Sequence, residues 1–267
     1  MTLAEVLVAG GAISEPNEAI ERADAVEDVI EVGGMEEDER SNSEEEELTV
    51  VHTRAGREAS GNLGKPTIPN FLNSQLNVTT LVRTASQATF PDGINVAKAD
   101  FNIDSLGKVF EGKDAVTSFI PITSLDEQAV VIEAAISAGV KRFIPSEYGS
   151  DSTNPAVVAA VPFFEAKKKY LDFLRTKENI LSWTALITGP LFDWVSATHT
   201  RRSSLGFYLT NKMAQLMGGG STRFTTSNGA QVARALVTIL ANPTKTANKV
   251  VSVESFTTTQ LEVLTTL

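Results

Sequence analysis

The sequence predicts an α/β fold in which helices cover both faces of a parallel β-sheet. Two observations support this prediction. From residue 48 onward, short runs rich in β-branched residues alternate repeatedly with segments of helical spacing, and short connections join them. Hydrophobic residues make up 42% of the 267-residue chain, which is enough to fill the core of such a fold. The length allows one large domain or two modest ones.

The expected strands and helices follow this alternation along the chain. Short apolar runs predict strands over residues 48–53, 95–100, 114–121, 181–189 and 249–255. Residues 77–86 predict a strand that runs into a polar turn, and residues 141–149 predict a strand with its exit loop. Segments with helical spacing predict helices within residues 57–75, 103–112, 124–139, 164–177 and 229–243. Residues 203–226 are less regular and predict a loop-rich cover with a tight turn at Gly218, Gly219 and Gly220.

Particular residues mark the ends of several helices. Pro66 lies near the start of the first helix, where a missing N–H is tolerated. Ser124 is a candidate N-cap of the third helix, with Glu127 three residues later as in a capping box. Gly112 and Gly139 are expected to end the second and third helices.

The N-terminal segment, residues 1–47, carries the acidity of the whole chain. It holds 16 Asp and Glu residues and only two basic residues, Arg22 and Arg40, whereas the remaining 220 residues hold 17 acidic and 21 basic residues. Because like charges repel and little apolar area is available for burial, we expect this segment to be disordered or loosely helical. The alternative is an acidic tail that contacts a protein partner.

A glycine-rich turn precedes the first predicted helix in the sequence SGNLGKP. Such a turn lets the backbone approach a pyrophosphate, and the helix N-terminus supplies N–H donors. Since strand–helix alternation continues after it, the pattern predicts a Rossmann-type dinucleotide site rather than a plain turn. The predicted cofactor contacts here are Gly61, Asn62, Leu63 and Gly64.

The end of the second predicted strand reads LVRTAS. In dinucleotide-binding folds this position faces the adenosine ribose, where an acid suits NAD and an arginine suits the additional phosphate of NADP. Arg83 occupies it and Ser86 follows closely. The sequence therefore favours NADP, and the competing interpretation of Arg83 is an ordinary surface arginine.

A third motif, RFIPSEYG, is followed by a lysine-rich helix. Ser146, Glu147 and Tyr148 fall after a central strand, where ligands of parallel sheets bind. Desolvation in a cleft lowers the pKa of a lysine such as Lys167 and suits it to proton exchange, and its two neighbouring lysines act in the same direction. The alternative is a solvated lysine face.

In order, GNLGKP, LVRTAS, FEGKDAV, AAISAGVKRFIPSEYG, ITGPLFDW and NKVVSVESFTTTQL resemble the NmrA-like and isoflavone reductase-like proteins, atypical members of the short-chain dehydrogenase superfamily, in their fungal form. The resemblance runs from about residue 60 to the end. It implies a Rossmann domain, NADP binding with Pro121 and Ser146 among the contacts, and a catalytic lysine that matches Lys167, or Lys168 by a one-residue slip. Tyr148, Phe192 and Trp194 are the expected substrate contacts.

These observations divide the chain into an acidic segment (1–47), a dinucleotide-binding Rossmann domain (48–189) and a smaller substrate-binding region (190–267), which also returns a helix and a strand to the main sheet. Two features depart from the family pattern. Glu58 stands where the first glycine of the turn belongs, so the first strand is residues 48–53 with a longer loop, or EVLVAGG near the N-terminus, or is replaced. The sequence also ends soon after KVVSVES, where the resemblance implies further helix, and without that helix we expect a more open cleft or a less stable fold.

The leading hypothesis is an NADPH-dependent reductase of a small aromatic or carbonyl-bearing molecule. The alternative is a catalytically silent dinucleotide sensor or regulator. The chain contains no Cys, which excludes disulfides and thiolate catalysis, and its two histidines lack carboxylates at metal-ligand spacing, so we expect no metal. The absence of a basic stripe, a long apolar run and a targeting segment predicts a cytoplasmic protein without nucleic-acid or membrane contacts.

Overall fold

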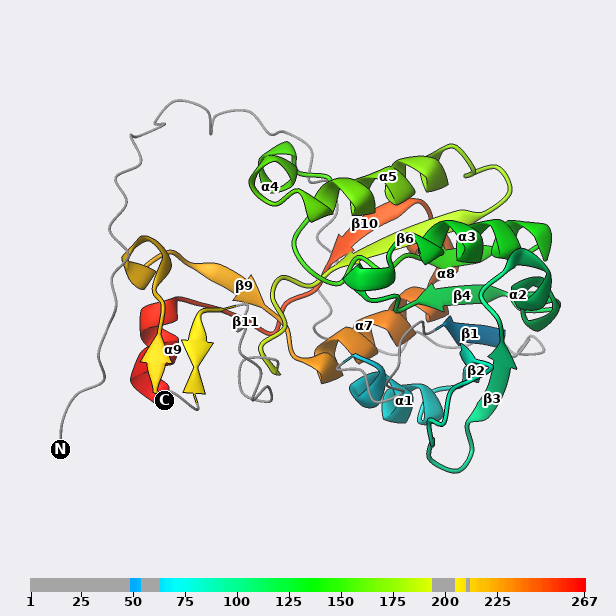
Figure 1. Ribbon diagram of the computed structural model, residues 1–267, viewed down its shortest axis with the longest axis horizontal. Helices are drawn as coiled ribbons and strands as arrows, with labels where there is room; N and C mark the ends of the chain where they lie inside the picture. Colours follow the sequence, from blue (N-terminus) through cyan, green and yellow to red (C-terminus); the bar gives the residue numbers. More distant parts are fainter. Residues whose placement is uncertain (1–48, 54–62, 194–204, 210–211) are drawn as a thin grey trace, which may run out of the picture.

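The computed structural model describes residues 49–53, 63–193, 205–209 and 212–267 (Figure 1). At its centre is a seven-stranded sheet in the spatial order β10-β6-β5-β4-β1-β2-β3, and every neighbouring pair in it is parallel. Its strands are β1 (Thr49–Thr53), β2 (Asn77–Arg83), β3 (Asn95–Ala99), β4 (Ala115–Ser118), β5 (Arg142–Ile144), β6 (Ser182–Ile187) and β10 (Lys249–Ser252). The predicted α/β fold with a parallel sheet is confirmed.

Strand order reverses at β1. The chain passes from β1 to β2 and β3 on one side of the sheet, then crosses to β4 and continues through β5, β6 and β10 on the other. Ligands of open parallel sheets bind beyond the carboxyl ends of the strands at such a reversal. Of the possibilities for the first strand, the run at residues 48–53 is confirmed as a strand of the sheet, since β1 spans Thr49–Thr53 and pairs with β2 and β4. EVLVAGG, like the acidic segment, lies outside the described residues.

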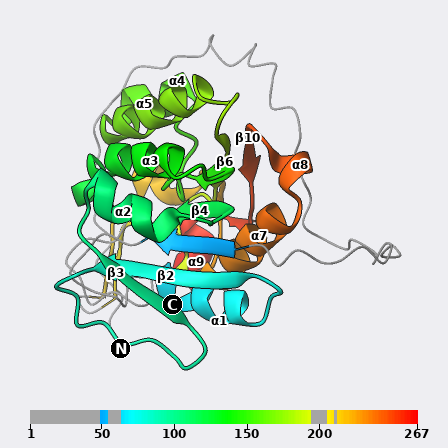
Figure 2. The same ribbon diagram turned by 90° about the vertical axis from the view of Figure 1, so that its right-hand side faces the viewer.

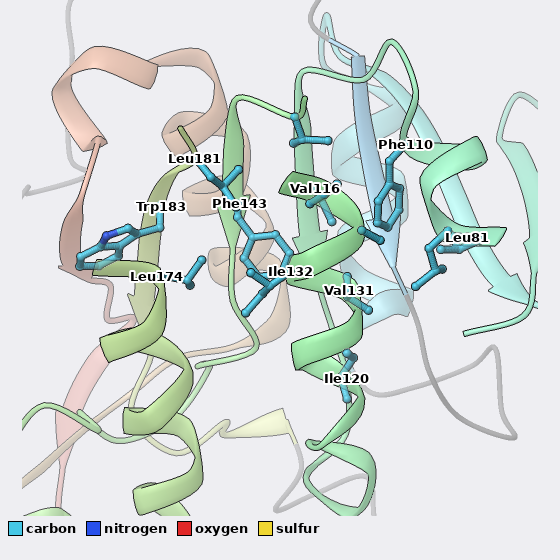
Figure 3. Packing of buried hydrophobic residues seen from close by; sticks show 14 of the residues in the cluster. Leu81, Phe110, Val116, Ile120, Val131, Ile132, Phe143, Leu174, Leu181 and Trp183 are labelled. Atoms are coloured by element: carbon cyan, nitrogen blue, oxygen red, sulfur yellow. The ribbon is translucent and has the colours of Figure 1, made fainter. Parts of the chain in front are cut away.

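Two layers of helices enclose the sheet (Figure 2). On one face lie α2 (Ile103–Phe110), α3 (Glu127–Ser137) and α5 (Phe163–Arg175), and on the other α1 (Gly64–Leu72) and α7 (Gly229–Ala241). The alternation of strand side chains divides the core accordingly: Phe143 packs in the first layer and the next residue, Ile144, in the second. Figure 3 shows the first layer, where Val116 and Phe143 from the sheet meet Ile132 from α3.

A smaller group of elements follows β6. β7 (Phe207–Tyr208) pairs with β8 (Met213–Ala214), and β9 (Phe224–Thr226) pairs with β11 (Phe256–Thr258), both antiparallel. Together with α9 (Gln260–Thr266) they bury a separate apolar cluster: Leu205, Phe207, Ala214, Leu216 and Val263. The predicted glycine turn is confirmed, because all three of its glycines have positive φ.

Several predicted details are corrected. Ser124 is not the N-cap of α3: it ends a short 3₁₀ turn, η1 (Ile122–Ser124), and α3 begins at Glu127 without a side-chain cap. The 3₁₀ turn forms because Ser124 N–H donates to the Pro121 carbonyl at 2.9 Å. Gly139 does end α3, with φ of +73°. The sequence prediction omitted α4 (Pro155–Ala160), α8 (Pro243–Thr246), β11 and α9.

None of the helices in the described part of the chain is both long enough and apolar enough to cross a membrane.

Candidate functional site

The loops that leave β2, β4, β5 and β6 meet at the carboxyl edge of the sheet, the end at which its parallel strands finish. Ser146 binds two of these loops together. Its backbone N–H donates to the Gln128 side chain and its hydroxyl donates to the Ile120 carbonyl, each at 2.8 Å. The loop after β5 is therefore fixed to the loop after β4 and to the start of α3.

Tyr148, in the same loop, has an unusual backbone. Its φ is +22°, a strained conformation for a non-glycine residue, and such residues are enriched at functional sites. The ring stacks on Phe119 with centroids 4.9 Å apart, and the hydroxyl has no hydrogen-bond partner among the described residues. Burial, with the charge of Glu147, raises the pKa of Tyr148 well above its ordinary value, so the hydroxyl stays neutral.

Lys167 lies on α5 and is buried, with 8% of its surface exposed. Its Nζ donates to the backbone carbonyl of Glu147 and lies 5.8 Å from the centre of the Phe164 ring. Burial lowers the pKa of Lys167, while the charge of Glu147 opposes this change. The structure thus brings together Lys167 and the loop that bears Ser146 and Tyr148, as a catalytic site at this edge requires.

The neighbouring lysines differ from Lys167. Lys168 is partly exposed and forms an ion pair with Asp172, one turn further along α5, and Lys169 is exposed. An open hollow beside them is lined by residues of α4, α5 and the connection between them: Pro155, Val158, Ala159, Pro162, Glu165 and Lys168. Of the predicted site residues, only Lys168, the alternative to Lys167, is in this lining. Burial therefore distinguishes Lys167 as the group with perturbed chemistry on this helix.

Arg83 leaves β2 at the carboxyl edge, as predicted. Its guanidinium group forms an ion pair with Glu127 at the start of α3 and lies 4.4 Å above the centre of the Phe101 ring. Ser86 accompanies it through a turn in which Ser86 N–H donates to the Arg83 carbonyl at 2.9 Å, and its own carbonyl accepts from Lys98. These contacts leave Arg83 37% exposed in its side chain and reachable by a ligand.

The remaining predicted residues are spread more widely. Gly61, Asn62 and Trp194 lie outside the described residues, as does Glu58. Leu63 immediately precedes α1, and Gly64 begins it. Pro121 is exposed at the start of η1. Phe192 packs edge-on against Phe256, with ring centroids 5.0 Å apart, and so belongs with the smaller group of elements.

Sequence reasoning missed two buried polar contacts of the site. Glu147 is fully buried and accepts a hydrogen bond from the Ser152 hydroxyl at 2.7 Å, and Gln128 is fully buried beneath the β4 and β5 loops. One signal was available for the first contact: a glutamate directly after an apolar strand, with hydroxyl and acidic residues following it. Among the described residues there is no cluster of His, Asp and Glu suited to a metal ion.

The start of α1, which is the predicted pyrophosphate end of that helix, packs against the start of α7. A Cβ atom built on Gly229 would lie 2.4 Å from Cγ of Pro66, so the two helices approach through the absence of a side chain. Gly229 N–H also donates to the Asp193 carboxylate at 2.6 Å. The position of α1 therefore depends on Gly229.

Gly229→Ala is expected to push α1 away from α7 and destabilise the protein by about 1–3 kcal/mol, as overpacking does. Thermal unfolding measures this loss of stability. A dinucleotide titration shows whether the displacement of α1 weakens cofactor binding. Gly107→Ala is the matched control, since Gly107 is also helical and its added Cβ meets nothing within 4 Å. The control is expected to be neutral or stabilising by about 0.5–1 kcal/mol. Equal stabilities of the two variants would contradict the prediction.

Comparison with known proteins gives one family and several relatives. A family model described as NAD(P)H-binding matches residues 59–243. Oxidoreductase aprR of Aspergillus flavus is 34% identical over 214 residues, which cover 78% of this chain and 70% of the relative. Oxidoreductase poxI of Penicillium oxalicum is 29% identical and covers 77% of this chain and 66% of the relative. The chain thus spans about two thirds of the length of these relatives.

Solved structures share the fold at lower identity. The complex of AtPrR2 with NADP+ and (+)pinoresinol has a TM-score of 0.67 at 20% identity and covers 82% of this chain and 74% of that one. An isoflavone reductase has a TM-score of 0.64 at 18% identity, with the same coverages. The leucoanthocyanidin reductase–NADPH complex from Vitis vinifera has a TM-score of 0.62 at 18% identity and covers 80% and 71%.

Proposed function

The chain belongs to the NAD(P)H-binding family, and from that premise we propose that it is an NADPH-dependent reductase of a small aromatic or carbonyl-bearing molecule. The observation that carries the proposal is the buried Lys167, which lies at the carboxyl edge of the sheet beside Tyr148, a residue with positive φ whose hydroxyl has no hydrogen-bond partner among the described residues. Relatives named oxidoreductases, and a similar fold seen with NADP+ and pinoresinol, support this type of chemistry.

The residues at the carboxyl edge fit a dinucleotide. Arg83 presents a guanidinium group that matches a phosphate in geometry and charge, and α1, which begins at Gly64, presents the positive end of its helix dipole. Tyr148 offers a neutral hydroxyl without a partner in the described part of the chain. The dinucleotide supplies the hydride when bound.

The protein's own residues would orient the substrate and manage the proton. Lys167 donates a proton from Nζ to the substrate oxygen as the carbonyl becomes an alcohol, and regains one from water. Tyr148 holds the same oxygen by a hydrogen bond, and Phe119, stacked on Tyr148, keeps its ring in place. Phe192 and Trp194, together with the rest of the smaller group of elements, would cover an apolar substrate.

Arg83→Ala tests the choice of cofactor. Loss of a charge-assisted contact costs about 1.5–3 kcal/mol, so NADPH affinity is expected to fall by about 10-fold to 100-fold while NADH affinity changes little. Titration followed by cofactor fluorescence measures both affinities. Arg175→Ala is the matched control, because Arg175 also pairs with an acid, Asp172, and lies over an aromatic ring, that of Trp183.

The outcomes separate the competing functions. Preferential NADPH binding that depends on Arg83, with turnover of some aldehyde, ketone or quinone, supports the reductase. Tight binding without turnover of any of these supports a silent sensor. Equal affinity for both dinucleotides, or equal effects of the two arginine variants, contradicts the NADPH assignment.

A further inference from the structure

Glu147 is the one acidic side chain of the β5 exit loop with no exposed surface. One carboxylate oxygen, Oε2, accepts a hydrogen bond from Ser152, which is itself fully buried. The other, Oε1, is buried without a partner among the described residues. A buried carboxylate with one oxygen unpaired is costly, so its retention needs a compensating charge.

Lys167 provides that charge. Its Nζ donates to the backbone carbonyl of Glu147, and both side chains are buried, so the two opposite charges belong to one buried site. Burial raises the pKa of Glu147 and lowers the pKa of Lys167, and in each case the charge of the other residue opposes the effect of burial. Asp151 raises the pKa of Glu147 from the same loop, and Tyr148 stays neutral.

We propose that Glu147 is the positioning residue of Lys167: its backbone carbonyl fixes Nζ in place, and its buried carboxylate, held by Ser152, keeps Nζ in the ammonium form. This inference deepens the proposed function, since it identifies what keeps the proton donor charged in a buried site. Glu147 itself does not touch the substrate.

Lys167 can act as a proton donor only while its amine is charged. A buried amine without an opposite charge loses its proton readily, because burial disfavours the charged form. A neutral Lys167 has no proton to give to a substrate oxygen. Glu147 therefore extends upward the pH range in which Lys167 is a proton donor, and Ser152 strengthens the effect by stabilising the ionised carboxylate.

Glu147→Gln separates the two roles of the residue. The variant keeps the backbone carbonyl and the side-chain shape, so only the negative charge is lost. NMR titration of protein containing isotope-labelled lysine follows Lys167 through its Cε signal, which Lys167→Met identifies by its disappearance. The midpoint of Lys167 is expected to fall by about one pH unit or more in Glu147→Gln.

Ser152→Ala is the second variant and retains the carboxylate. It is expected to move the Lys167 midpoint in the same direction by a smaller amount. Lys168, whose partner is Asp172, provides the internal control and is expected to keep its midpoint in both variants. A Lys167 midpoint that stays at the wild-type value in both variants would overturn the proposal.

The titration needs neither dinucleotide nor substrate, so it is independent of the proposed reductase activity. If the Lys167 midpoint falls as expected in Glu147→Gln but the wild-type protein turns over no substrate, the result counts against the proposed function and supports this inference. Where turnover is found, the alkaline limb of its pH profile is expected to move downward by the same amount in Glu147→Gln, which a purely structural role would not produce.

Discussion

Lys167→Met is expected to reduce kcat by about 100-fold to 10,000-fold, the range of a lost general acid. Methionine matches the length and apolar stem of lysine but carries no proton, so the cleft keeps its shape while the proton donor is lost. NADPH affinity is expected to change little, because Lys167 contacts Glu147 and Phe164 rather than the end of β2 where Arg83 lies.

Lys168→Met is the matched control. It removes the next lysine on α5, which is half-exposed and paired with Asp172, and we expect its turnover to remain near that of the wild type. Turnover is measured with NADPH and whichever aldehyde, ketone or quinone the wild type reduces, and far-ultraviolet circular dichroism checks the fold. Lys167→Met with wild-type kcat and an intact fold would remove Lys167 from the chemistry, and a larger loss in Lys168→Met would reassign the role to Lys168.

The fold prediction depended on local periodicity. The β-branched run at residues 48–53 forms strand β1, at which the strand order reverses. Leu171 and Leu174, spaced three residues apart, both lie in the core on the inner side of α5. Strand ends were less predictable. Residues 141–149 were expected to hold a strand and its exit loop without a stated boundary between them, and β5 ends at Ile144, because the residues beyond it bond to side chains and carbonyls of other loops.

Contacts between distant residues were not predictable. Glu127 was expected to cap α3, whereas it pairs with Arg83, which lies 44 positions earlier in the chain. Glu147 and Ser152 read as polar loop residues, and only their common burial shows that they belong together. Sequence periodicity indicates which face of an element is buried, but not which polar groups meet on that face. The position of the site at the strand ends could therefore be predicted, whereas the contacts among its side chains could not.

Gly189→Ala is expected to destabilise the protein by about 2–6 kcal/mol, the sum of backbone strain and a steric clash. Gly189 follows β6 with φ of +62°, which only glycine adopts readily, and a Cβ atom there would lie 2.5 Å from the Thr225 carbonyl oxygen of β9. The two nearest atoms, the oxygen and carbon of the Thr225 carbonyl, belong to the backbone, so no side-chain rotation relieves the clash. Thermal unfolding is expected to show a fall in Tm of about 5–20 °C.

Gly112→Ala is the matched control, because it introduces the backbone strain without the steric clash. Gly112 has a similar φ of +69°, but nothing lies within 4 Å of its added Cβ, so this variant is expected to lose only about 1–2 kcal/mol. A comparable loss in both variants would show that conformational strain, not the contact with β9, dominates.

The Gly189 contact also bears on the site. The N–H groups of Thr188 and Gly189 both donate to the Gly149 carbonyl, at 3.1 and 3.0 Å, and Gly149 lies in the loop that carries Glu147 and Tyr148. A shift of the β6 exit therefore moves the carbonyl that holds Lys167. Below its lowered Tm, Gly189→Ala is expected to lose turnover and shift the Lys167 midpoint, whereas Gly112→Ala leaves both unchanged, because catalysis here depends on strand ends that are fixed to one another.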